Sequence, residues 1–195
     1  MELILGSQSP RRSKILSYFN LHFKQISSDF DESLIPFKGD PNEYVKILSM
    51  KKGEALNLLH PTAVILTADT IVYFNGKVYG KPRNLDEAFE YLKQLSGNWH
   101  QVFTGLSVFY QNQIYQAVEE TQVQLHYLTE KQIEVYHQNH EFADKAGAYM
   151  IQGSGGIVVK QIKGCYYNVM GLPINSLVEV LKPAGIDLWE HLKEK

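Results

Sequence analysis

The sequence predicts a mixed α/β fold, in which helices flank one sheet that contains both parallel and antiparallel strands. Apolar runs typical of strands alternate along the chain with helix-start signals, which favours helices packed on a sheet. Two strand pairs are joined by short turns and must be antiparallel, so the sheet is not the all-parallel, doubly wound type. The 195 residues suffice for one domain, 1–195, or for one domain divided into two lobes by a cleft.

The chain opens with a strand, a serine-rich turn and a helix start. Residues 3–5 predict a short buried strand, and Ser9 followed by Pro10 predicts an N-cap and a first helical position. The free N–H groups of such a turn favour an anion, and Arg11 and Arg12 oppose the helix dipole unless an anion is nearby. We expect the turn to hold phosphate; the alternative is a well-capped surface helix with solvated arginines.

The later elements are predicted from caps, turns and apolar spacing. Asp40, Asn84 and Thr129 are N-cap residues, each followed three positions later by Glu or Gln. Asn75-Gly76 marks a hairpin with a type I′ turn. The predicted order is a helix over 41–59, a strand over 63–66, a hairpin over 71–79, a helix over 85–95, a strand pair over 102–127 with a turn at 111–113, a short helix over 130–138, a glycine-rich segment over 146–169 and a last helix from 172 to 181.

Composition and charge exclude several classes of protein. With a net charge of −2, the chain lacks the basic surface that general binders of nucleic acid or anionic membranes need. The single cysteine, Cys165, excludes an internal disulfide framework and fits a reducing cytoplasm. No apolar run approaches the ~18 residues needed to cross a bilayer. We therefore expect a cytoplasmic protein that binds neither nucleic acid nor membranes.

Two acidic groups are candidates for chemistry. Asp69 is placed where the predicted strand over 63–66 runs into the sequence TADT, and the ends of strands present functional groups in α/β folds. Glu32 lies with Asp29 and Asp31 in a second acidic segment. The two groups could share a divalent cation, because Mg²⁺ joins one or two carboxylates to substrate phosphates. The alternatives are a structural turn at Asp69 and a solvated acidic loop.

Lysines border the same expected site. In the helix over 41–59, Lys51 and Lys52 lie on either side of an apolar face that ends at Leu59. This position is explained equally well by a ligand site and by lysine stems that pack along the apolar face while their charged ends reach solvent. Lys81 is held on a stiff loop between a glycine and a proline. Clustering of these lysines with the arginines of the first helix favours a polyphosphate ligand.

Several familiar sites are absent or weakly supported. The phosphate-binding pattern G-x-x-x-x-G-K-[ST] does not occur, and GSGG at 153–156 lacks the spacing of a dinucleotide-binding loop. His137 and His140 have helical spacing, but no H-E-x-x-H surrounds them, so a metal role is disfavoured. Cys165 has no histidine near it in sequence and is expected to be a small packed residue.

Eight ordered segments resemble motifs of the Maf family of nucleoside triphosphate pyrophosphatases, over nearly the whole chain. They are LGSQSPRR at 5–12, DFDES at 29–33, KGEA at 52–55, TADT at 67–70, GKP at 80–82, LSGNWHQVFTG at 95–105, DKAGAYMIQG at 144–153 and YNVMGLP at 167–173. The resemblance implies a curved mixed sheet with two lobes around a central cleft, as in Maf and inosine triphosphate pyrophosphatase-like folds. It also implies hydrolysis of a nucleoside triphosphate to the monophosphate and pyrophosphate.

The resemblance further implies roles for single residues. Asp69 would be the catalytic acid or base, and Glu32 and Asp69 would hold the required divalent cation, Mg²⁺ or Mn²⁺. Whether Asp69 acts as base or as metal ligand stays open. The implied phosphate-binding residues are Ser7, Ser9, Arg12, Lys52 and Lys81.

Three positions resemble the branch of the family that acts on dTTP and UTP. They are Arg11, Thr70 and Gln152, where the branch for a methylated guanine nucleotide has a bulky aromatic residue, Gln and Glu. Met150 and Tyr167 depart from the usual pattern and add bulk near the expected site. The expected role is removal of non-standard pyrimidine nucleotides. The alternatives are a non-catalytic nucleotide-binding regulator of cell division and an inosine or xanthosine triphosphate pyrophosphatase. The oligomeric state is left open, a homodimer included.

Overall fold

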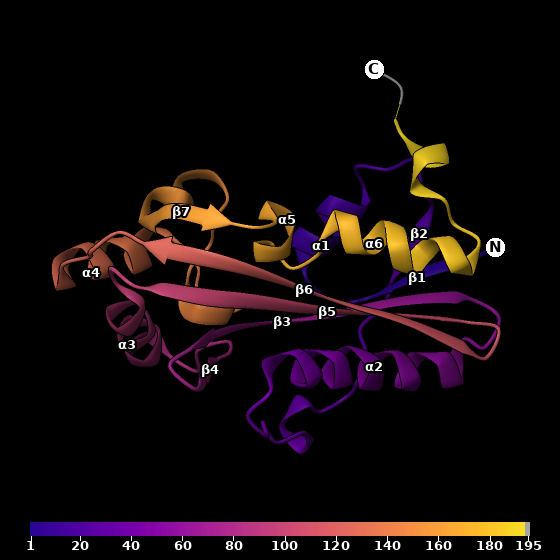
Figure 1. The fold of residues 1–195 in the computed structure, drawn as a ribbon, viewed down its shortest axis with the longest axis horizontal. Helices are drawn as coiled ribbons and strands as arrows, with labels where there is room; N and C mark the ends of the chain where they lie inside the picture. Colours follow the sequence, from indigo (N-terminus) through magenta and orange to yellow (C-terminus); the bar gives the residue numbers. More distant parts are fainter. Residues whose placement is uncertain (194–195) are drawn as a thin grey trace.

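The computed structural model describes residues 1–193. Over these residues, seven strands form one sheet in the order β2–β1–β3–β5–β6–β7, with β4 paired to β3 outside this path (Figure 1). The strands are β1 (Leu3–Gly6), β2 (Phe23–Gln25), β3 (Val64–Phe74), β4 (Lys77–Tyr79), β5 (Trp99–Tyr110), β6 (Gln113–Leu125) and β7 (Val159–Lys163). β1 runs parallel to β2 and β3, and the other pairings are antiparallel, which confirms the predicted mixed sheet.

Helices cover both faces of this sheet. They are α1 (Pro10–Leu16), α2 (Pro41–Leu59), α3 (Leu85–Leu95), α4 (Glu130–Asn139), α5 (Tyr166–Val169) and α6 (Ile174–Leu181). α2 lies along one face, α1, α5 and α6 lie on the other, and α3 and α4 lie towards one end of the long strands (Figure 1). None of the helices within residues 1–193 is both long and apolar enough to cross a membrane.

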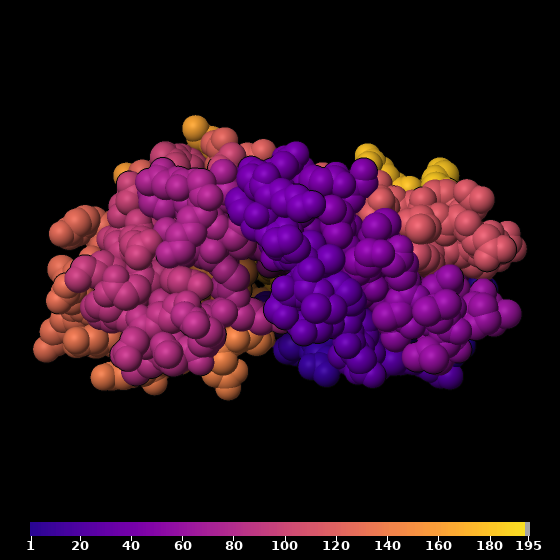
Figure 2. All heavy atoms as spheres, turned by 90° about the horizontal axis from the view of Figure 1, so that it is seen from below, coloured from indigo at the N-terminus to yellow at the C-terminus, as the bar shows by residue number. Residues whose placement is uncertain are grey.

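Two large apolar clusters support the two lobes. One packs α1 and α6 against β1, β3 and β5, and the other packs α3 and α4 against β5, β6 and β7. Between the lobes the surface is hollowed, as the view from the α2 side in Figure 2 shows. The fold therefore has the two lobes and the central cleft that the resemblance implied.

β3, like β5, runs through both lobes. The predicted strand over 63–66 does not end before Asp69 but continues through it, from Val64 to Phe74, so that prediction was wrong. The cause lies in β5, because residues 101–109 pair with 65–73 of β3 without interruption. Asp69 is therefore an interior residue of a long strand.

The opposite edge of β3 is interrupted. β1 pairs with residues 64–67 and β4 pairs with residues 72–74, so neither strand pairs with residues 68–71. Successive residues of a strand point to opposite faces of the sheet. Asp69 accordingly contacts α2 and Thr70 contacts α1, while both border the gap. The cleft opens at this gap.

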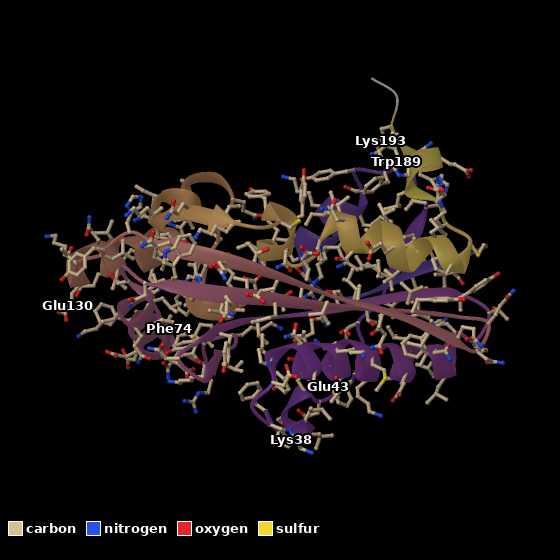
Figure 3. The ribbon with its side chains drawn as sticks, viewed as in Figure 1. Lys38, Glu43, Phe74, Glu130, Trp189 and Lys193 are labelled. Carbon is tan, nitrogen blue, oxygen red and sulfur yellow. The ribbon has the colours of Figure 1, made fainter. Side chains whose placement is uncertain are left out.

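α2 packs on the sheet through a face that differs in part from the predicted one. The buried residues are Val45, Leu48, Ser49, Lys52, Gly53 and Leu56. Leu59 is 72% exposed, so its predicted place on the buried face was wrong. Of the two lysines, Lys51 is half-buried and pairs with Glu54 at 2.7 Å, whereas Lys52 is buried. Glu43, in the first turn of α2, and Lys38, which lies before the helix, are on the side of α2 away from the sheet (Figure 3).

The close approach of α2 to the sheet explains this face. A Cβ on Gly53 would lie 2.1 Å from the Phe109 ring, and a Cβ on Gly105 would lie 2.4 Å from the carbonyl oxygen of Val45. Glycine on both surfaces therefore lets helix and sheet backbones come together. As a result, the side chain of Lys52 reaches β3.

Three of the predicted helix caps and the predicted hairpin turn are confirmed. The side chains of Asp40, Asn84 and Thr129 cap their helices by accepting backbone N–H groups. Asn75 and Gly76 have φ angles of 48° and 78°, which is the left-handed backbone that a type I′ turn requires. These caps and this turn are formed by residues that lie close together in the chain, which is why the sequence alone predicts them.

We expect Gly105→Ala to destabilise the fold, because the added methyl group would strike the backbone of α2. Urea unfolding should show a free energy of unfolding lower by about 1–3 kcal/mol. Gly80→Ala is the matched control, since no atom of residues 1–193 outside its immediate neighbours in the chain lies within 4 Å of a Cβ there, and it should not lower the free energy of unfolding. Equal stability of the two variants would contradict a tight helix–sheet contact.

Candidate active site

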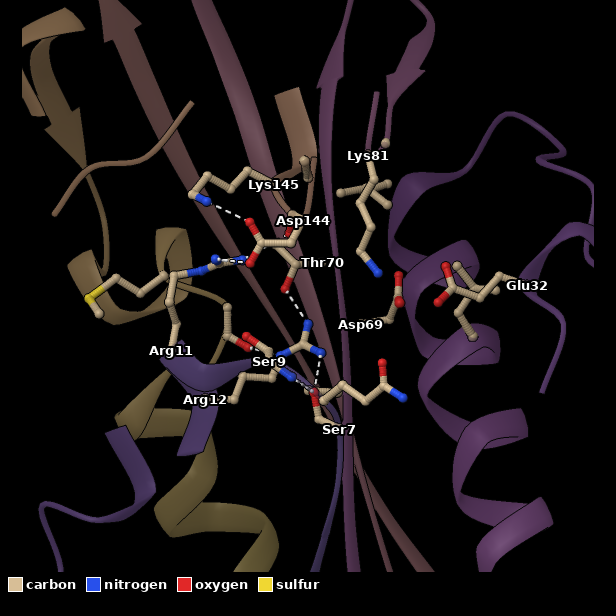
Figure 4. Close-up of a pocket in the computed structure, with 18 of the residues that line it drawn as sticks. Ser7, Ser9, Arg11, Arg12, Glu32, Asp69, Thr70, Lys81, Asp144 and Lys145 are labelled. Carbon is tan, nitrogen blue, oxygen red and sulfur yellow. Dashed lines mark hydrogen bonds and ion pairs between the residues drawn. The ribbon is translucent and has the colours of Figure 1, made fainter. Parts of the chain in front are cut away.

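The gap in β3 opens into a cleft of about 680 Å³ between the lobes (Figure 2 and Figure 4). All ten residues that the sequence indicated for a site line this one cleft. They are Ser7, Ser9, Arg11, Arg12, Glu32, Lys52, Asp69, Thr70, Lys81 and Gln152. They come from segments far apart in the chain, so only the folded arrangement brings them together.

A buried lysine joins the two candidate carboxylates. Nζ of Lys52, on α2, lies 2.8 Å from Oε1 of Glu32 and is in direct contact with Oδ1 of Asp69. Lys52 is 9% exposed and Asp69 is 6% exposed, so each buried charge needs its partner. Burial raises the pKa of Glu32, but the charge of Lys52, with smaller effects of Lys81 and Arg12, outweighs burial and lowers it. Glu32 is therefore held as a carboxylate.

Arg12 is held by neutral acceptors. Its Nε donates to the carbonyl oxygen of Gly171 at 2.8 Å, and its two terminal nitrogens donate to the hydroxyls of Ser7 at 3.1 Å and Thr70 at 3.0 Å. No ion pair to Arg12 is present in residues 1–193. Burial lowers the pKa of Arg12, yet a guanidinium group stays charged in proteins. Its positive charge is thus uncompensated by a direct partner and suits an anion in the cleft.

The hydrogen bonds around Ser7 leave its hydroxyl proton free. The Ser7 hydroxyl accepts from Arg12 and from the backbone N–H of Ser9, so its own proton can be donated into the cleft. Ser9 occupies the predicted N-cap position, but its hydroxyl makes no capping hydrogen bond. Thr70 accepts from Arg12 and pairs with the hydroxyl of Thr104 at 2.9 Å. Thr70 therefore holds Arg12 in place, a contact that no sequence pattern indicates.

Lys81 approaches from the other lobe. It follows β4 directly after Gly80, and its exposed side chain extends towards Asp69 (Figure 4). Its charge is one of the factors that lower the pKa of Glu32. Cations from both lobes therefore act on the same acidic wall of the cleft.

Arg11 differs from Arg12 because its charge is already paired. Its guanidinium donates to Oδ2 of Asp144 at 2.6 Å and to the carbonyl oxygen of Asp144 at 3.0 Å. Lys145 contacts Oδ1 of the same carboxylate at 2.5 Å (Figure 4). Nothing in the sequence assigns a role to Asp144 or Lys145 beyond their place at the head of DKAGAYMIQG. The ion pair links α1 to the segment that leads towards Gln152.

Gln152 also lines the cleft. It directly precedes a 3₁₀ turn, Gly153–Val158. Its Oε1 is buried and has no hydrogen-bond partner among the side chains and backbone of residues 1–193. A buried oxygen without a hydrogen bond lowers the stability of the folded protein by about 1–3 kcal/mol unless a ligand supplies a donor. The position therefore suits a ligand that carries an N–H or O–H group.

The chain is similar to known proteins over almost its full length. The family model for Maf-like protein matches residues 2–184. A dTTP/UTP pyrophosphatase of Chlamydia caviae is 44% identical over 98% of both chains. A dTTP/UTP pyrophosphatase of Clostridium perfringens is 45% identical over 96% of this chain and 100% of its own. The solved structure of the Staphylococcus aureus Ham1 protein covers 98% of this chain and 94% of its own at 13% identity, with a TM-score of 0.49, a likeness too distant to bear on function.

These similarities extend far beyond single motifs. The family match includes every residue that the sequence indicated for the cleft, from Ser7 to Gln152. The relatives align along nearly the entire chain, so the likeness covers both lobes as well as the cleft between them. This chain belongs to the Maf family.

Proposed function

We propose that this protein hydrolyses dTTP and UTP to the nucleoside monophosphate and pyrophosphate. One observation carries the proposal. At the gap in β3, the carboxylates of Glu32 and Asp69 line the same cleft as the uncompensated guanidinium of Arg12. Binding a nucleotide without turnover would need only the cations, whereas hydrolysis also needs groups that position and deprotonate water. The name of the two relatives at 44% and 45% identity supports the choice of substrates.

The triphosphate is bound at the end of the cleft formed by the turn after β1. Arg12 uses N–H groups not engaged by the protein to bind phosphate oxygens, and Ser7 donates its free proton to another, with Ser9 beside it in the same turn. Lys81 reaches the phosphates from the opposite lobe. Together these groups stabilise the negative charge that develops as pyrophosphate leaves.

A divalent cation fits the acidic wall of the cleft. Glu32 and Asp69 contact the same ammonium group, so their oxygens are close enough to share one ion. Residues 1–193 contain no cluster of three or more His, Cys, Asp or Glu side chains suited to a metal, so phosphate oxygens and water would complete the ligand set. This is the usual arrangement for Mg²⁺. Bound there, Mg²⁺ or Mn²⁺ would neutralise charge on the phosphates.

Asp69 acts as the base in this proposal. Lys52 contacts Oδ1 and orients the carboxylate, and Oδ2 accepts a proton from the attacking water. The water oxygen bonds to the α-phosphorus as the bond from that phosphorus to the bridging oxygen breaks. The products are the nucleoside monophosphate and pyrophosphate, and the proton taken by Asp69 returns to solvent.

Base recognition is assigned to Gln152. Uracil and thymine present an N3–H donor between two carbonyl acceptors, and a glutamine amide matches one donor and one acceptor of that edge. The unpaired Oε1 of Gln152 accepts from N3–H, while the amide N–H donates to a carbonyl oxygen. Arg11 and Asp144 form the neighbouring wall as an ion pair. Thr70 contributes indirectly, because it holds Arg12.

We also infer that the protein acts in the cytoplasm without nucleic-acid or membrane partners. This inference rests on the net charge of −2 and the single cysteine.

Asp69→Asn should lower kcat for UTP by roughly 10² or more, because the amide keeps the shape of the side chain but cannot take a proton. KM should change less than kcat, since Ser7, Arg12 and Lys81 still bind the phosphates and Glu32 remains for the cation. Pyrophosphate release under saturating UTP measures the effect, and Asp86→Asn, at an exposed position on α3, is the control. Wild-type kcat in the Asp69 variant would exclude it as the base.

Excess EDTA should abolish pyrophosphate release, and added Mg²⁺ or Mn²⁺ should restore it, because the carboxylates and the triphosphate bring several negative charges together. The melting temperature should not fall in EDTA, since Lys52 already forms an ion pair with each of the two carboxylates within the protein. Full turnover in excess EDTA would contradict the requirement for a metal.

Gln152→Glu should raise KM for UTP about tenfold or more while kcat changes less, because a carboxylate cannot donate to the base and a buried group is left unpaired at a cost of about 1–3 kcal/mol. The measurement is kcat/KM for UTP, dTTP, CTP, GTP, ATP, ITP and XTP on both proteins. Wild type should prefer dTTP and UTP. Equal wild-type values for UTP and GTP, or the same preference in the variant, would place base selection elsewhere.

A further inference from the structure

The segment that carries Gln152 has a backbone that must be held in place. Gly147 and Ala148, a few residues earlier, have φ angles of 71° and 61°. Ala148 has a side chain, and this left-handed region is unfavourable for residues other than glycine. The backbone at Gly155 also packs directly against the side chain of Met150, because a Cβ on Gly155 would lie 2.2 Å from Cγ of Met150. Such a conformation persists only where surrounding groups support it.

One tyrosine hydroxyl joins the two sides of this segment. Tyr136, on α4, is 5% exposed, and its Oη accepts from the backbone N–H of Met150 at 3.1 Å. The same hydroxyl donates to the carbonyl oxygen of Gly155 at 3.2 Å. Met150 and Gly155 flank Gln152 in the chain, so a single buried hydroxyl fixes the span of the loop over 150–155.

His137, on the same helix, and His140, at its C-cap, add further contacts. Nε2 of His137 lies 3.1 Å from the carbonyl oxygen of Ala148, which can only accept, so that nitrogen is the donor. The ring of His140 stacks on Tyr136 with centroids 4.6 Å apart, and its Nε2 bonds to the hydroxyl of Ser154 at 3.0 Å. The H-x-x-H pair of the sequence thus supports the segment around Gln152.

We propose that Tyr136 is a positioning residue for base recognition, because its hydroxyl sets the span of the loop over 150–155 and so directs the Gln152 amide towards the base. This inference rests on the proposed function and deepens it. The hydrogen bonds that Tyr136, His137 and His140 make to this segment all go to residues on either side of Gln152, which leaves its amide for a ligand. The phosphate end of the cleft is built by other elements, α1, α2 and β3.

The test is Tyr136→Phe, which keeps the ring and removes only the hydroxyl. KM for UTP and dTTP should rise about tenfold, as expected for two lost hydrogen bonds, while kcat changes less than about twofold. The preference for UTP over GTP should fall by a similar factor. Inhibition by tripolyphosphate, which has no base, should be unchanged, because that probe uses only the phosphate end.

Tyr79→Phe is the matched control. Tyr79 is equally buried, at 3% exposed, and its hydroxyl donates to Gln94 at 2.6 Å, away from Gln152. It should match wild type in KM, in base preference and in tripolyphosphate inhibition. Wild-type KM and preference in Tyr136→Phe would overturn the proposal. A parallel loss of affinity for UTP and for tripolyphosphate would also overturn it, since the role would then be general support of the fold.

Amide hydrogen exchange separates this inference from the proposed function. Tyr136→Phe should speed exchange in residues 148–156 and leave the segment around Lys52 and Asp69 unchanged. Exchange at the wild-type rate in residues 148–156 would overturn the role of the hydroxyl, whatever the substrate. If wild type releases no pyrophosphate from UTP or dTTP, the proposed function fails, whereas faster exchange confined to residues 148–156 still supports the positioning role.

Discussion

The buried contact of Lys52 with two carboxylates is the interaction on which the rest of the site depends. An ammonium group is too costly to bury alone, so Lys52 can lie between α2 and the sheet only because Asp69 and Glu32 meet it there. The contact also requires α2 to lie close to the strands, which Gly53 and Gly105 allow. The packing of one helix thereby decides where the carboxylates are held. It also orients Asp69, the group to which we assign proton transfer.

The cleft itself follows from the change of partner along one edge of β3. β1 pairs with the first part of the strand and β4 with the last part, and residues 68–71 between them pair with neither strand and line the cleft. Because adjacent residues point to opposite faces, the gap receives groups from both layers of the fold. Lys52 reaches Asp69 from one face, and Arg12 reaches Thr70 from the other. A continuous neighbouring strand would have filled this space.

The two ends of the cleft differ in how their charges are compensated. Within residues 1–193 Arg12 has only neutral hydrogen-bond partners, so its charge attracts an anion, whereas Arg11 is paired directly with Asp144, a carboxylate that Lys145 also contacts. The proposed phosphate end is therefore cationic. The proposed base end offers hydrogen bonds from an amide, Gln152, whose loop is held by α4. This division suits a ligand with a highly charged tail and an uncharged planar base.

Patterns along the chain were enough to predict most of the local elements and the residue types of the site. Caps such as Asp40 and the turn at Asn75-Gly76 act within a few residues, and the ordered motifs indicated the residues that line the cleft. Three features became known only from the folded arrangement: β3 continues through Asp69, Lys52 rather than Lys51 is buried, and each arginine is held by its own set of acceptors. These outcomes depend on surfaces that belong to distant parts of the chain. Strand pairing, close helix–sheet packing and ion pairing are set by partners that no local pattern contains.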